Sequence, residues 1–101
     1  MSIVLPDGRE SELQVADIGR LRDSLRHFSG PAVRILDRKL AMAADTTMAV
    51  ELDRLEAAAL RKALEHLSGD AHSSGLELLY RDVAIALRRD ARLEQAVRRL
   101  H

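Results

Sequence analysis

Hydrophobic residues along this chain recur mainly at intervals of three and four positions, which is the spacing of one face of an α-helix. Two stretches combine this pattern with a stop signal, residues 13–32 and residues 52–71. In each stretch a Ser-Gly pair follows the last apolar position, and glycine is the residue that most often ends a helix. The pattern therefore predicts helices over about residues 15–28 and 53–67.

These two stretches are similar to each other at a constant offset of 39 residues. Identical pairs at this offset include Leu21 and Leu60, Leu25 and Leu64, and His27 and His66. In the second copy, Asp53 and Glu56 have the spacing of a capping box, which marks a helix start near residue 53. We interpret the chain as containing an internal repeat of about residues 1–32 and 40–71.

Short strands are predicted ahead of both helices. Residues 3–5 and 10–13 flank a Pro-Asp-Gly triplet at residues 6–8, and these residue types favour a tight turn that joins two strands. At the repeat offset, residues 40–44 and 48–52 would flank a second turn, with apolar and polar residues alternating over the latter segment. The repeat therefore predicts a hairpin followed by a helix, twice.

A helix over residues 32–44 is the alternative to the second hairpin. Val33, Leu36, Leu40 and Ala43 also lie at helical spacing. Pro31 suits the first turn of a helix, where its missing N–H would have no partner. The sequence leaves both possibilities open.

The last quarter of the chain predicts a long helix over about residues 75–100. Ser74 and Glu77 form a capping box, and apolar positions then follow at helical spacing. We name six of them the C-terminal stripe: Leu79, Val83, Leu87, Leu93, Val97 and Leu100. Because the stripe is longer than the other predicted helices can cover, we expect it to be an interaction surface, and a homodimer would bury it by two-fold symmetry.

Composition supports one helix-dominated domain over residues 1–101. Hydrophobic residues make up 47% of the chain, yet it has one Phe, one Tyr and no Trp, so the core must be built from aliphatic side chains. We expect an α+β fold, dominated by helices, in which a duplicated hairpin-helix unit is followed by the C-terminal helical segment 75–101. An all-α bundle of four or five helices is the alternative.

Charge and cysteine content narrow the function classes. The charges of the 16 basic and 16 acidic residues cancel, so the chain has no net positive charge to attract nucleic acid. The chain also has no Cys, which excludes disulfides, thiolate metal sites and a Cys nucleophile. Neither a signal peptide nor a membrane-spanning run is present, so we expect a cytoplasmic protein without a membrane partner. The preference for Arg over Lys, together with abundant Ala, indicates a bacterial origin.

Two Arg-x4-His segments are candidates for catalysis: Arg22 with His27, and Arg61 with His66. This spacing resembles that of the HEPN family of helical ribonucleases, in which two copies of the motif face each other. The resemblance implies RNA cleavage, with Arg stabilising the charge of the phosphorane and His moving the proton of the 2′-hydroxyl. The alternative role is structural, because both histidines precede a helix stop, where a cation meets the negative end of the helix dipole.

No other motif in the sequence indicates a catalytic, metal-binding or cofactor-binding site. The four histidines have neither the spacing nor the carboxylate partners of a recognisable metal site, and no glycine-rich phosphate loop is present, so we predict no metal and no cofactor. From residue 76 onward six Arg oppose four acids, a small excess that makes nucleic-acid binding possible without favouring it. We therefore expect a non-enzymatic protein-interaction or regulatory module, with an RNA-cleaving or RNA-binding protein as the alternative.

Overall fold

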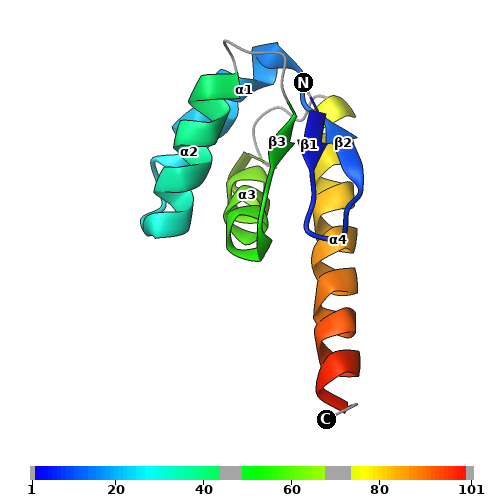
Figure 1. Cartoon of the computed structure of the whole chain (residues 1–101). Coiled ribbons are helices and arrows are strands. Elements are labelled where there is room, and N and C mark those ends of the chain that lie inside the picture. Colours follow the sequence, from blue (N-terminus) through cyan, green and yellow to red (C-terminus); the bar gives the residue numbers. More distant parts are fainter. Residues whose placement is uncertain (1, 44–48, 68–73, 100–101) are drawn as a thin grey trace.

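The computed structural model describes residues 2–43, 49–67 and 74–99, and along the last helix it describes the side chains of residues 75–89. Its elements in chain order are β1 (Ser2–Val4), β2 (Glu10–Glu12), α1 (Val15–Leu25), α2 (Pro31–Ala43), β3 (Val50–Glu51), α3 (Arg54–Leu67) and α4 (Ser74–Arg99). Figure 1 shows that helices dominate and that the hairpin of β1 and β2 lies beside the first half of α4. The α+β, helix-dominated class is confirmed, and the all-α bundle is wrong.

The small sheet has β1 in its middle, with β2 antiparallel on one side and β3 parallel on the other. Ile3 is paired with Ser11 in β2 and with Val50 in β3. In the turn between β1 and β2, the backbone N–H of Gly8 donates to the carbonyl of Leu5 at 2.8 Å. Gly8 has φ +88°, a conformation that L side chains rarely adopt. The first predicted hairpin is therefore confirmed.

The second predicted hairpin is wrong, because the segment expected to supply its first strand belongs to α2. Along this helix Leu36, Leu40 and Ala43 are buried at helical spacing. A strand would turn alternate residues to opposite faces and would not bury this set together. Gly30, with φ +132°, provides the bend between α1 and α2, and Pro31 occupies the first turn as the alternative prediction required.

Strand β3 falls within the predicted strand over residues 48–52 but pairs with β1. The backbone N–H of Leu52 donates to the carbonyl of Val4 at 2.9 Å, which extends this pairing. Residue 44 and the turn expected at residues 45–47 lie outside the described residues. The internal repeat stays a prediction: at its offset β2 and α1 match β3 and α3, whereas β1 falls on the end of α2.

The start of α3 is fixed by the predicted capping box. The Asp53 carboxylate accepts from the backbone N–H of Glu56 at 2.8 Å, and the Glu56 carboxylate accepts from the backbone N–H of Asp53 at 3.3 Å. The Glu56 side chain is only 5% exposed, and its Oε2 lies 2.7 Å from Nζ of Lys39 in α2. Lys39 also donates to the carbonyl of Glu51 in β3 at 2.8 Å. We name this group of contacts the Glu56 cluster; it joins α2, β3 and α3.

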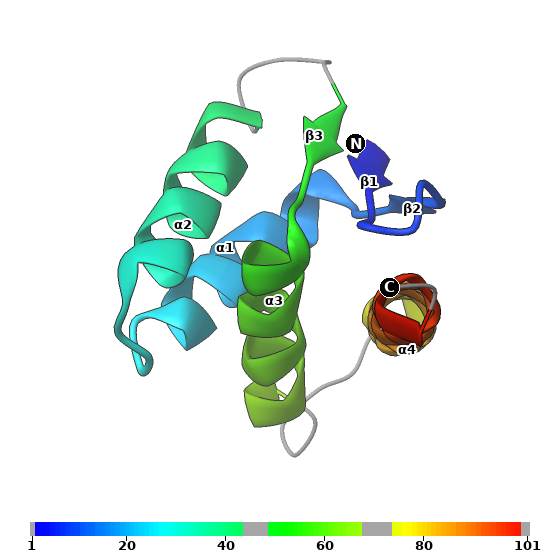
Figure 2. The ribbon, with the colours of Figure 1, turned by 60° about the horizontal axis from the view of Figure 1, so that its bottom comes forward.

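Helix α3 is the centre of the fold. It contacts α1, α2 and α4, and Figure 2 shows it between the α1 and α2 pair and α4. The core is aliphatic, as the composition predicted. Its largest fully buried side chains are Ile3, Leu5, Leu13, Leu21, Leu25, Leu36, Leu40, Leu60, Leu64, Leu76, Leu79 and Val83.

The predicted long C-terminal helix is α4. Its first half packs against α3 and β2, and the Ser11 hydroxyl of β2 donates to the Asp82 carboxylate of α4 at 2.9 Å. Arg89 Nη1 lies 4.0 Å from the Asp7 carboxylate in the hairpin turn. Beyond this point α4 runs past the hairpin and past the end of α3, as Figure 1 shows.

We expect Glu56→Ala to lower the free energy of unfolding by about 2 kcal/mol, the upper range for a lost helix cap, because Lys39 also loses its buried partner. Urea unfolding followed by circular dichroism measures the change. Asp23→Ala is the control, since it removes a carboxylate that is 73% exposed and 3.6 Å from Arg26; we expect a change within about 0.5 kcal/mol. Equal losses in the two variants would contradict a special role for Glu56.

Asp53 gives the stability a pH dependence. The pKa of its carboxyl is lowered, chiefly because it accepts a hydrogen bond from the backbone N–H of Glu56. Such a group stabilises the fold above its unfolded pKa, about 3.9 for Asp, and this contribution is lost as the pH falls through the folded value. Asn caps a helix about as well as Asp but does not titrate. We therefore expect the stability advantage of the native chain over Asp53→Asn to shrink below about pH 4.

Urea unfolding at a series of pH values tests this expectation. Glu10→Gln, at the exposed start of β2, is the control for removing one carboxylate. A difference between the native chain and Asp53→Asn that stays constant from neutral to acidic pH would show that the charge of Asp53 does not stabilise the helix start.

Candidate functional site

The two histidines of the Arg-x4-His segments lie side by side. The ring centroids of His27 and His66 are 4.4 Å apart, and the ring planes are inclined by 38°. His66 is in the last turn of α3, and His27 follows the end of α1. Both residues are exposed, and Phe28 approaches the ring of His66 edge-on at 6.0 Å between centroids. The fold thus brings together two candidate residues that are far apart in the sequence.

A buried hydrogen bond next to this pair fixes how α1 and α3 cross. The Ser24 hydroxyl donates to the carbonyl of Ala63 at 2.8 Å, and Ser24 is only 3% exposed. Ser24 and Ala63 are 39 positions apart, which is also the separation of His27 and His66. Contacts between equivalent positions arise when two copies of a segment face each other across a two-fold axis. The repeat offset predicted from the sequence therefore coincides with the contacts that place the two imidazoles.

A shallow hollow of about 210 Å³ lies at the histidine pair. It is lined by Arg20, Asp23, Ser24, His27, His66 and Leu67. Sequence reasoning missed Arg20, although it precedes Ser24 by four positions and His27 by seven. The four-residue spacing places Arg20 and Ser24 on one side of α1, which is the signal that could have identified Arg20 as a neighbour of the site.

The two predicted arginines point elsewhere. Arg22 donates to the Asp37 carboxylate of α2 at 2.9 Å, and this contact raises the pKa of Arg22. Arg61 donates to Glu65 at 3.1 Å, and its pKa is raised chiefly by the hydroxyl of Tyr80 and then by Glu65. Neither arginine lines the hollow, because five positions along a helix rotate a side chain by about 140° away from the later residue. Arg22 thus joins α1 to α2, whereas the bond of Arg61 to Glu65 lies within α3.

The C-terminal stripe divides into two parts. Leu79 and Val83 are fully buried in the core, and Leu87 is partly buried against it. The side chains of Leu93 and Val97, and residue Leu100, lie outside what the structure describes. Since Leu79 and Val83 pack within their own chain, only the part from Leu87 onward remains a candidate for contact with a partner.

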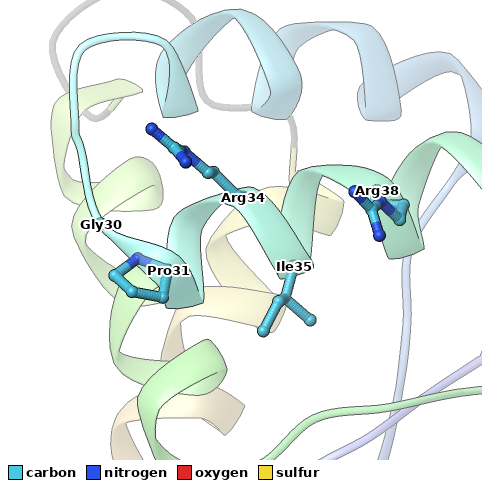
Figure 3. A pocket seen from close by; sticks show the side chains of 5 residues that line it. All are labelled: Gly30, Pro31, Arg34, Ile35 and Arg38. Carbon is cyan, nitrogen blue, oxygen red and sulfur yellow. The ribbon is translucent and has the colours of Figure 1, made fainter.

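A second hollow, of about 490 Å³, lies at the start of α2. It is lined by Gly30, Pro31, Arg34, Ile35 and Arg38. Figure 3 shows the guanidinium groups of Arg34 and Arg38 well apart, with the Ile35 side chain pointing to another side of the helix. The two arginines therefore do not form a clamp for one anion, and this hollow is a groove along a single helix.

Two general features of the described part of the chain bear on function. Within residues 2–43, 49–67 and 75–89, no group of three or more histidine and carboxylate side chains is placed to hold a metal ion. Among the described helices, none is long and apolar enough to cross a membrane.

No protein-family model, curated protein or solved structure matches the chain. Geometry and chemistry therefore carry the functional inference.

Proposed function

We propose that this protein is an interaction module that forms a homodimer through the second half of α4. The observation that carries the proposal is the course of α4, which leaves the body of the fold after Arg89 and continues as a helix to Arg99. In Figure 1, no other described element lies beside the last turns of this helix.

The first half of α4 is a firm base for such a surface. Leu76, Leu79, Val83 and Ala86 are fully buried against the rest of the chain. The hydrogen bond from Ser11 to Asp82 adds a polar contact with the hairpin. A helix anchored in this way presents its continuation in a defined direction, which lowers the entropy lost when a partner binds.

The second half of α4 has a reason to bind a partner. Residues 87–99 span about 20 Å, and an isolated helix of this length is marginal in water. In the sequence, apolar positions continue at Leu93, Val97 and Leu100 with the alternating spacing of three and four that is typical of coiled coils. A partner that covers these positions would stabilise the helix and remove the apolar stripe from water.

A second copy of the chain is the partner that the stripe fits. A two-fold pair buries the same surface on both copies, so one sequence feature serves both sides of the interface. Asp90 comes four positions after Ala86 and three before Leu93. This helical spacing puts it in line with the C-terminal stripe. A parallel pair in register would place the two Asp90 residues opposite each other, and the like charges would repel. We therefore propose an antiparallel pair, in which Asp90 faces a different position of the partner.

Sedimentation equilibrium of the native chain and of Val97→Glu tests the homodimer. We expect the native chain to dimerise and the variant to be monomeric with unchanged helix content, because a carboxylate on the stripe would be buried without a partner. Leu78→Glu is the control: Leu78 is 59% exposed on the first half of α4, so the same change there leaves the dimer intact.

The orientation is tested by spin labels on the single cysteine of Arg98→Cys, since the chain has no native Cys. An antiparallel pair places the two labels at opposite ends of the interface, and a parallel pair places them next to each other. A native chain that stays monomeric at about 1 mM, where an association of roughly −4 kcal/mol is visible, would refute the homodimer.

Cleavage of RNA by His27 and His66 is the second candidate function. The contact between the two imidazoles favours it, because one neutral imidazole can accept the 2′-hydroxyl proton while a second, protonated one donates to the leaving oxygen. The family resemblance assigned the cationic role to Arg22 and Arg61. The hollow favours Arg20 for that role, since Arg20 lines it together with both histidines.

The test is incubation of the chain with a single-stranded RNA oligonucleotide and with the DNA of the same sequence, in the presence of EDTA. We expect cleavage of RNA alone, because DNA lacks the 2′-hydroxyl, and loss of cleavage in His27→Ala, His66→Ala and Arg20→Ala. Arg22→Ala, whose side chain pairs with Asp37, is the control that retains the rate. No cleavage by the native chain above the buffer background would remove this function.

A further inference from the structure

The imidazoles of His27 and His66 also have the arrangement of a partial metal site. Imidazole nitrogen is the preferred ligand for Zn²⁺ in a chain without Cys. Two nitrogens bound to one tetrahedral Zn²⁺ at about 2.0–2.1 Å lie roughly 3.3 Å from each other. The ring centroids are 4.4 Å apart, so a shared ion requires the two exposed rings to turn about their side-chain bonds until one nitrogen of each reaches this separation.

Two helix ends and one carboxylate contribute negative charge near the rings. His66 lies in the last turn of α3, and His27 follows the last turn of α1, so the negative ends of two helix dipoles meet at this place. The Asp23 carboxylate lines the same hollow. Its ion pair with Arg26 is 3.6 Å long and highly exposed, which makes the pair weak and leaves Asp23 able to move. Arg20 also lines the hollow, and its positive charge opposes the binding of a cation.

One buried hydrogen bond and one ring contact hold the two ligands in place. The hydrogen bond from Ser24 to the carbonyl of Ala63 fixes the crossing of α1 and α3 one turn before the histidines. Phe28 packs edge-on against His66 and limits how far that ring can turn away. A metal ion at this place therefore meets two ligands that are already neighbours, which lowers the entropic cost of binding.

We propose that His27 and His66 bind a divalent transition-metal ion of the Zn²⁺ class and that the bound ion links the C-terminal ends of α1 and α3. With two protein ligands, water completes the coordination, so the site is open to solvent and of modest affinity. This inference is independent of the homodimer, because the site lies at the ends of α1 and α3 and not on α4.

Titration of the full chain with ZnCl₂ tests the site, with two readouts. Isothermal calorimetry gives the stoichiometry and the dissociation constant, and NMR of the imidazole groups identifies which histidines respond. We expect one Zn²⁺ per chain, with signal changes confined to His27 and His66. We also expect Zn²⁺ to raise the melting temperature, because an ion that binds the folded state alone stabilises it.

Variants separate this site from the other histidines. His27→Ala and His66→Ala are each expected to weaken Zn²⁺ binding by about tenfold or more, since even indirect partners of a metal ligand contribute this much. His72→Ala and His101→Ala remove the other two histidines of the chain and are the matched controls, with affinity unchanged. Equal affinity in His27→Ala and the native chain, signal changes at His72 or His101 instead, or no Zn²⁺ binding would each overturn the proposal.

Discussion

The buried carboxylate of Glu56 is the contact on which the arrangement of α2, β3 and α3 depends. It closes the first turn of α3 with Asp53 and pairs with Lys39 of α2, which in turn holds the carbonyl of β3. A carboxylate that is almost fully buried is costly unless every strong partner is in place. Shifting any one of the three elements would break this network, so one side chain sets the position of α2 on the central helix.

The helices of this fold could be predicted because their signals are local. Apolar spacing and the capping box at Asp53 depend on neighbours within one or two turns, and the hairpin depends on one Pro-Asp-Gly turn. The predicted glycine stop did not end the first helix: α1 ends at Leu25, three residues before the predicted end, and Gly30 lies in the bend that follows. Whether residues 40–43 form a strand or a helix does not depend on local signals alone. The repeat offset favoured a strand there, but burial of Leu36 and Leu40 against α3 decides for a helix. Where a repeat and a helical apolar pattern disagree, packing decides.

At the candidate site, too, some features could be predicted from the sequence and others depended on contacts between distant residues. The sequence places His27 and His66 at the same offset of 39 residues as Ser24 and Ala63, and both pairs are in contact. That the two motifs would face each other was an implication of the family resemblance. The roles of the arginines could not follow from a linear spacing. Arg22 lies on another side of α1 and pairs with Asp37 of α2, a helix that the sequence offered only as the alternative to a second hairpin. The C-terminal stripe predicted as an interaction surface proved to be core in its first half, because Leu79 and Val83 look like the rest of the stripe in sequence but are buried.

The parallel pairing of β1 with β3 has a consequence for the order in which the chain gains its structure. Ile3 of β1 pairs with Val50, so β1 has both of its strand neighbours only after half of the chain is available. Ser11 of β2 bonds to Asp82, so the hairpin meets α4 later still. During synthesis from the N-terminus, the hairpin can form early, but the second edge of β1 stays unpaired until β3 follows, and β2 stays undocked until α4 follows. The start of this protein is therefore the last part of its core to be closed.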